Sequence, residues 1–207
     1  LAMHSVLWFT LAASVCLQAV AFMIPWWADE ERYGTYQDAW KRLNQSSNQT
    51  YYLVRATYRS DGYIWGRNFR CVSVLETTFD AQNTSVFEFT FMNETRYGRW
   101  MNFTVNRTVE AYKRYSYKNP NALKFLLNGN RMLVKTFIFT DGKTCDLLSA
   151  PYGRKKLECE LWVSATFADN IPLCCLLLLE EFCTRRVTYT IYNKTMCSSL
   201  PPPPRPR

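Results

Sequence analysis

The feature that most constrains the fold is a change to period-two patterning that begins near residue 50. Aromatic and β-branched residues are concentrated in eight short runs, and Asn, Asp, Gly or Pro turns separate the runs. The runs are 51–58, 69–77, 85–93, 103–117, 123–127, 132–140, 144–149 and 157–165. Such a succession predicts an antiparallel meander. Closing it into a barrel removes the unpaired edges, and an eight-stranded barrel is wide enough to hold one small ligand.

Two predicted helices flank these strands. A short one is expected over 36–43, and a longer, strongly apolar one over 171–183, where Pro172 follows Asn170 at the start. We expect the second helix to pack on the barrel wall; a membrane-binding role is the alternative. A last strand is predicted over 187–192, and residues 198–207 are a proline-rich tail, expected to be disordered or polyproline II.

The start of the chain has the pattern of a secretory signal peptide. A mostly apolar run over 6–17 is shorter than the roughly 20 residues that span a bilayer, and a small-residue cleavage site at 19–21 follows it. A short membrane anchor is the alternative. We expect a signal peptide over 1–21 and a mature chain from residue 22. His4 is the one histidine, so the mature protein would have no histidine for catalysis or for a metal site.

Cysteines and glycosylation sequons agree with export. Of eight cysteines, Cys16 falls in the expected leader, and seven follow it: Cys71, Cys145, Cys159, Cys174, Cys175, Cys183 and Cys197. Three disulfides with one odd thiol is the simplest arrangement in an oxidising compartment, and spacing leaves the connectivity open. No C-x-x-C pair indicates zinc, and we expect no metal or cofactor. The Asn-x-Ser/Thr sequons are Asn44, Asn48, Asn83, Asn93, Asn102, Asn106 and Asn193.

A formal charge of +8 leaves several partner classes open. No nucleic-acid-binding motif accompanies the charge, so we expect neither nucleic acid nor a membrane as a partner. Glu160 with Asp146 or Asp61 is the one carboxylate pair to consider for acid–base chemistry. It has no accompanying cleft pattern, and we expect no enzyme.

Short motifs occur in order along the chain: WADE at 27–30, QDAWK at 37–41, YYLVRATY at 51–58, WG at 65–66, FRCV at 69–72, FMN at 91–93, CD at 145–146, ELW at 160–162 and NIP at 170–172. Together these motifs resemble the tick salivary histamine-binding lipocalins. The resemblance covers residues 27–197. It implies a secreted all-β protein: an eight-stranded antiparallel lipocalin barrel with a short N-terminal helix and a C-terminal helix on the wall, in a domain over 22–197.

The resemblance also implies disulfides. The two bonds of the family correspond here to Cys71–Cys197 and Cys145–Cys175. Related tick lipocalins often add a third bond, which would be Cys159–Cys183 and would leave Cys174 unpaired or paired with another chain.

Most of an amine-binding site is implied in the same way. A buried amine needs carboxylates and aromatic faces to offset its desolvation. The matching ligand-binding residues are Tyr58, Asp61, Phe125 (a Tyr in the family), Glu160 and Trp162 for the high-affinity site, with Trp65 and Asp146 for a weaker one. Strand alternation predicts that Tyr52, Val54, Ala56 and Tyr58 face the barrel interior, the lumen, and that Arg55 and Thr57 face outward.

The sequence departs from the family at its acids. A family Glu falls on Asn106 or Arg107, and two further acids correspond to Ser46 and Thr136. If Asn102 and Asn106 carry glycans, odd positions face the lumen and Arg107 enters it. There Arg107 either pairs with Asp61 or Glu160, or binds the carboxylate of a lipid mediator between aromatic walls such as Phe87, Phe89 and Phe91.

Three functions therefore remain open. The first is capture of a small host mediator, histamine or another biogenic amine, in tick saliva to suppress inflammatory defence. The second is binding of an anionic or apolar lipid mediator, such as an eicosanoid, fatty acid or sterol, through Arg107. The third is inhibition of a host protein through loops.

Overall fold

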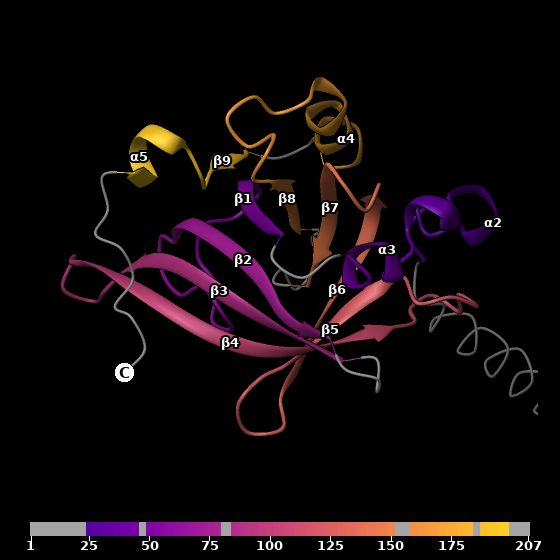
Figure 1. Ribbon diagram of the computed structural model, residues 1–207, viewed down its shortest axis with the longest axis horizontal. Coiled ribbons are helices and arrows are strands. Elements are labelled where there is room, and N and C mark those ends of the chain that lie inside the picture. The colour runs from indigo at the N-terminus through magenta and orange to yellow at the C-terminus, as the bar shows by residue number, and fades with distance from the viewer. Residues whose placement is uncertain (1–23, 46–48, 80–83, 152–157, 184–186, 199–207) are drawn as a thin grey trace, which may run out of the picture.

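The alternating runs form eight antiparallel strands that close into a barrel, as predicted (Figure 1). The computed structural model describes residues 24–45, 49–79, 84–151, 158–183 and 187–198. Each strand pairs with the next, and β1 also pairs with β8, which closes the sheet. The strands are β1 (Thr50–Ala56), β2 (Arg70–Phe79), β3 (Thr84–Glu94), β4 (Trp100–Tyr112), β5 (Ala122–Leu126), β6 (Met132–Thr140), β7 (Cys145–Ala150) and β8 (Glu158–Ser164).

Strand β4 ends earlier than the sequence pattern predicts. The run 103–117 was expected as one strand, but β4 stops at Tyr112. Tyr115 and Ser116 adopt the left-handed region with φ of 55° and 62°, a conformation that an extended strand does not contain. A turn therefore replaces the end of the predicted strand.

The predicted inward face of β1 is wrong for Tyr52 and Val54. The residues of this strand that are buried inside the barrel are instead Tyr51, Leu53 and Ala56. Val54 packs in a second hydrophobic cluster, outside the barrel wall, which also includes Leu179 of the C-terminal helix. A register irregularity between Leu53 and Arg55 in the pairing with β8 is the cause, because an extra residue shifts the alternation by one.

Thr57, which follows β1, lies between Ala56 and Tyr58, both of which belong to the interior core, so it faces outward as predicted. It is nevertheless buried, and its hydroxyl accepts a hydrogen bond from the Cys159 amide of β8 at 2.8 Å.

Three short helical turns precede β1, where one helix over 36–43 was predicted. They are α2 (Glu30–Tyr33), the 3-10 turn η1 (Gly34–Tyr36) and α3 (Trp40–Leu43). The break follows from buried Gln37, whose side-chain amide donates to the carbonyls of Trp27 at 2.9 Å and Ile138 at 3.0 Å. These bonds hold α3 against the barrel and direct its Arg42 and Leu43 into buried positions.

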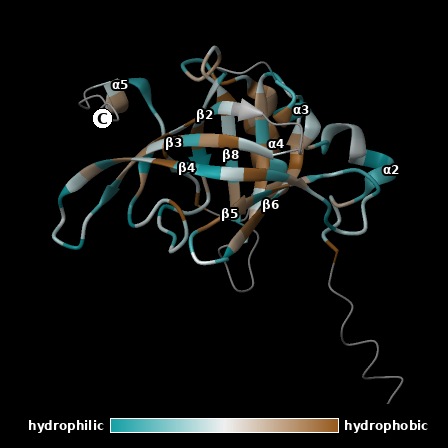
Figure 2. Ribbon diagram, turned by 60° about the horizontal axis from the view of Figure 1, so that its bottom comes forward, coloured by the Kyte–Doolittle hydropathy of each residue, from teal (hydrophilic) through white to brown (hydrophobic). Residues whose placement is uncertain are grey.

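The C-terminal helix packs on the barrel wall. α4 (Leu173–Cys183) covers the outer faces of β7 and β8, and two disulfides, Cys145–Cys175 and Cys159–Cys183, bond it to these strands (Figure 1). Figure 2 shows the contrast between the largely hydrophilic α2 and the hydrophobic residues that gather on the strands and on α4.

After α4, the predicted strand 187–192 shortens to β9 (Tyr189–Thr190), which pairs with the end of β1. A third disulfide, Cys71–Cys197, joins β2 to α5 (Lys194–Ser198). These are the three pairs that the resemblance implies, and Cys174 is left as an exposed free thiol.

Several expectations fall outside the described residues. They are the signal peptide over 1–21, the tail after Ser198, and the sequons Asn48 and Asn83. Among the remaining sequons, Asn44, Asn106 and Asn193 are exposed. Asn93 instead donates its side-chain amide to the Trp65 carbonyl at 2.9 Å. Within the described part of the chain, no helix has the length and apolar character needed to cross a membrane.

Candidate functional site

A buried ion pair lies in the barrel interior. Glu160 on β8 and Lys135 on β6 have side chains only 0% and 1% exposed, and the lysine Nζ is 2.7 Å from each carboxylate oxygen. Trp162 donates its indole N–H to the same carboxylate at 3.0 Å, and the Tyr58 hydroxyl donates to it as well. The carboxylate of Glu160 is thus paired and hydrogen-bonded, as a buried charge must be.

Aromatic rings complete the surroundings of the lysine ammonium. Its Nζ lies 4.9 Å from the ring centroid of Trp65, 5.3 Å from Phe125 and 5.9 Å from Trp162. Rings at this distance attract a cation through their quadrupoles. We call the set formed by Tyr58, Trp65, Phe125, Glu160 and Trp162 the ammonium cage, because it combines one carboxylate with several aromatic faces around an ammonium group.

The fold assembles the cage from distant segments. β6 and β8 are separated by β7, whose Leu148 pairs in register with Phe137 on one side and Glu160 on the other. Residues paired directly across strands face the same side of the sheet, and so do residues two apart on one strand. Glu160 therefore faces the lumen with Leu148, and Lys135 does so with Phe137, which is two residues away. Leu148 belongs to the same interior core, so the polar pair is enclosed by apolar side chains.

Asp61 holds the loop that delivers Trp65. Its carboxylate accepts hydrogen bonds from the amides of Tyr63 at 2.6 Å, Ile64 at 2.7 Å and Trp65 at 3.0 Å. Burial raises the pKa of Asp61, and the three amide donors act against that shift. Asp61, matched by the resemblance to a ligand-binding acid, serves in this structure to position an aromatic wall of the cage.

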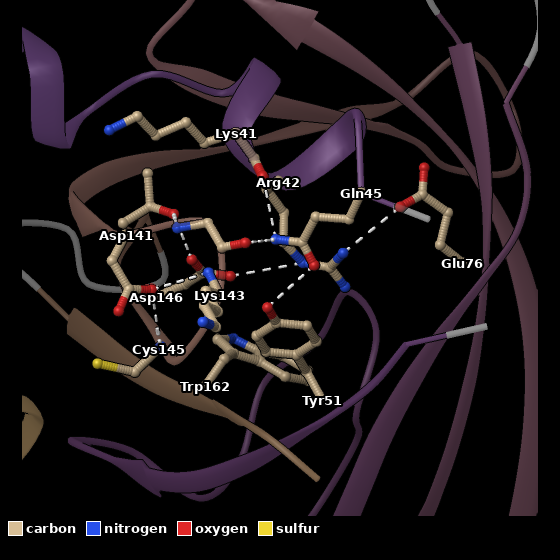
Figure 3. A network of polar contacts seen from close by, with 12 residues as sticks. Lys41, Arg42, Gln45, Tyr51, Glu76, Asp141, Lys143, Cys145, Asp146 and Trp162 are labelled. Carbon is tan, nitrogen blue, oxygen red and sulfur yellow. Dashed lines mark hydrogen bonds and ion pairs between the residues drawn. The ribbon is translucent and has the colours of Figure 1, made fainter. Parts of the chain in front are cut away.

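A second charged cluster is centred on Arg42, between carboxylates on either side (Figure 3). Its guanidinium lies 3.4 Å from Glu76 and 3.4 Å from Asp146. It also lies over the rings of Tyr51, at 4.2 Å, and Phe87, at 5.1 Å from the centroids. We call these five residues the arginine cluster. Within the described residues, the Nη2 of Arg42 has no hydrogen-bond partner.

Burial disfavours the charged forms of both acids in the arginine cluster. It raises the pKa of Asp146 to about 6, although Arg42 and a hydrogen bond from the Thr140 hydroxyl act in the opposite direction. Burial likewise raises the pKa of Glu76, which accepts a hydrogen bond from Ser85 at 2.6 Å. Tyr51, buried beside Asp146, has its pKa raised to about 12 by the same desolvation.

A small cavity lies between the two charged groups. Its volume is about 20 Å³, and Arg42, Lys135 and Asp146 border it together with aromatic and aliphatic side chains. A water molecule needs roughly 10–15 Å³ on this measure. Between the two charged groups, the side chains of the described residues therefore leave room for about one water.

The structure brings together five of the eight predicted ligand-binding residues: Tyr58, Trp65, Phe125, Glu160 and Trp162. Asp146 lies in the arginine cluster and Asp61 in the loop. Whether these residues bind a ligand remains a prediction.

Arg107 forms neither of the two ion pairs that were one alternative for it. Odd positions on β4 do face the core, since Val109 is buried and Asn106 is exposed. The guanidinium of Arg107, however, donates from Nη1 to the Asn106 carbonyl at 3.0 Å. Pairing of Arg107 with Glu160 does not form, because Lys135 already holds that carboxylate. Pairing with Asp61 does not form either, since backbone amides occupy it.

Sequence reasoning missed both buried cations. The sequence did contain a signal for Lys135. It is the one charged residue in the run 132–140, and it shares the inward face of that run with Leu133 and Phe137. Arg42 carried none, because a helix of four residues has too short a pattern to show its facing. Among the described residues, no group of His, Cys, Asp and Glu side chains is arranged to hold a metal ion.

Comparison with known proteins gives a consistent result. A model of the tick histamine-binding protein family matches residues 27–199. The male-specific histamine-binding salivary protein of Rhipicephalus appendiculatus is 33% identical over 202 residues, covering 95% of this chain and 98% of that protein.

Solved structures share the fold at lower identity. Japanin from Rhipicephalus appendiculatus, bound to cholesterol, matches with a TM-score of 0.52 and 18% identity over 71% of this chain and 95% of Japanin. A serotonin complex of AM182 matches with a TM-score of 0.51 and 21% identity over 81% of this chain and 95% of AM182. Because these two proteins hold a sterol and an amine, the shared fold does not select the ligand class.

Proposed function

The chain belongs to the tick histamine-binding protein family, and from that premise we propose that it is a secreted salivary lipocalin that captures a small host amine. Histamine is the first candidate, as the names of its relatives indicate. Withholding such a mediator in the barrel would suppress the inflammatory response of the host. No enzymatic activity belongs to this proposal.

The observation that carries the proposal is the ammonium cage. Glu160 supplies a fully buried carboxylate, and three rings lie within 6 Å of the one ammonium group that it holds. A carboxylate offsets the desolvation of a cation, and the rings add cation–π attraction. The cage therefore has the chemistry that a protonated amine requires, and Lys135 demonstrates that an ammonium fits it.

An anionic mediator is the second candidate, because two buried cations, Arg42 and Lys135, border the same cavity. Each of them already faces a carboxylate, Lys135 at 2.7 Å and Arg42 at 3.4 Å. An incoming carboxylate would have to displace these internal partners. This competition is the reason for placing the amine first.

The test is calorimetry on the secreted protein with histamine, serotonin and arachidonic acid, each titrated to millimolar concentration. Amine binding should be saturable and should be lost in Glu160→Gln, which removes the carboxylate but keeps the side-chain shape. Arg107→Ala is the matched control and should leave amine binding unchanged. Binding of arachidonic acid alone would replace the amine proposal by the anionic one.

A further inference from the structure

We propose that Lys135 is a built-in occupant of the ammonium cage, and that this side chain sets the affinity and selectivity of the barrel for amines. The inference rests on the proposed function and adds a residue to it. The ammonium of Lys135 occupies the position that a captured amine would need, so an amine competes with a group tethered to the barrel wall.

The first support is the state of the Glu160 carboxylate. One oxygen accepts from the Tyr58 hydroxyl, from Lys135 and, at 3.5 Å, from the Trp65 indole N–H. The other accepts from Lys135 at 2.7 Å and from Trp162 at 3.0 Å. A carboxylate offers about four lone-pair positions. These contacts use them, so a second ammonium finds no acceptor until Lys135 withdraws.

The second support is space. The residual cavity holds about 20 Å³, whereas pockets for small organic ligands have volumes of roughly 300–1,000 Å³. The rings of Trp65, Phe125 and Trp162 form the cage walls. Lys135, in contrast to these rings, has a flexible and unbranched side chain, so its withdrawal is the simplest way to open room beside Glu160.

The third support is charge. With Lys135 in place, an amine in the cage would bring two ammonium groups together away from solvent, and like charges in a buried site disfavour each other. Amine binding therefore draws on the fraction of molecules in which Lys135 has withdrawn. The apparent affinity falls by that fraction.

This reasoning defines a chemical test. Beyond its Cβ atom, the lysine side chain is a propylammonium group, so Lys135→Ala leaves a cage of that shape with Glu160 at its end. The variant is titrated with n-propylammonium and with n-propanol, which has a similar size but no charge. Emission of Trp65 and Trp162 reports binding, and thermal unfolding reports stabilisation.

Lys124→Ala is the matched control. Lys124 pairs with Glu110 at the same N–O distance of 2.7 Å, but the two side chains are 22% and 31% exposed, far more than Lys135 and Glu160. We expect Lys135→Ala to bind propylammonium saturably and to unfold at a higher temperature in its presence, with no effect of propanol. The wild type and Lys124→Ala should show neither response.

Histamine then links the inference to function. The affinity of Lys135→Ala should exceed that of the wild type by about 100-fold, because opening a buried ion pair is costly. Measurable but equal histamine affinity in the two proteins, or no response of Lys135→Ala to propylammonium, would overturn the inference. If propylammonium binds but no physiological amine does, the proposed function fails while the inference stands.

If the empty cage prevents Lys135→Ala from folding, the variant is refolded with propylammonium or with propanol at equal concentration. Recovery of folded protein with propylammonium alone supports the inference, and failure with both overturns it. Lys135→Met combined with Glu160→Gln, which fills the cage and removes both charges, should fold and bind no amine; amine binding to it would also count against the inference.

Discussion

Replacing Lys135 by methionine tests how much the buried ion pair contributes to stability. Methionine keeps most of the volume of the lysine side chain but removes its charge. Glu160, which is fully buried, then loses the ammonium at 2.7 Å from both of its oxygens. Breaking a buried pair by removing one partner costs about 3–5 kcal/mol, because it leaves a charge uncompensated.

The structure places the cost toward the lower end of that range. Glu160 keeps the hydrogen bonds from Tyr58 and Trp162, and a hydrogen bond to a charged group is worth about 1.5–3 kcal/mol. We therefore expect Lys135→Met to lower the free energy of unfolding by about 3 kcal/mol. Adding Glu160→Gln should restore most of that loss, because the double variant buries no charge at this site.

The measurement is urea unfolding at neutral pH with intact disulfides, followed by tryptophan emission. A double-mutant cycle over Lys135 and Glu160 isolates their coupling. A second cycle over Lys124 and Glu110, at the same 2.7 Å separation but partly exposed, should give less than about 1 kcal/mol. Equal coupling in the two cycles would refute the reasoning, since burial would then have no effect.

Three further predictions concern other parts of the barrel. Burial raises the pKa of Asp146 from 3.8 to about 6, so the folded state binds this proton more tightly than the unfolded state does. The protonated carboxyl therefore contributes about 3 kcal/mol to the free energy of unfolding. This contribution is full below about pH 4 and is lost as the pH rises through 6. Urea unfolding of Asp146→Asn across this range should lack that decline. Replacing Cys71 and Cys197 by alanine opens a loop of 126 residues and should lower the free energy of unfolding by about 5 kcal/mol in the chain-entropy model, measured by thermal unfolding. Gly66→Ala should cost about 1–3 kcal/mol, because φ is +76° and the new Cβ would lie 2.5 Å from the Asn93 side-chain amide; unchanged urea unfolding would contradict the assigned strain.

Local patterns were sufficient to predict the barrel. Alternation with a period of two marks each strand directly, and the helix over 171–183 showed both its proline start and its apolar composition. The facing of β1 could not be predicted in this way. Tyr52 and Val54 follow the alternation in sequence, but the irregularity before Arg55 is fixed by pairing with β8, which is a contact with residues a hundred positions away.

The candidate site was also predicted only in part. The sequence by itself determined the eight-stranded barrel, and the family resemblance supplied the residues of the ammonium cage and the disulfide pairs. Only the tertiary structure decided what occupies that cage. Lys135 and Glu160 lie on strands separated by β7, and no short-range pattern records that their side chains meet. Burial then makes their pairing obligatory, because in the lumen neither charge has water as an alternative partner.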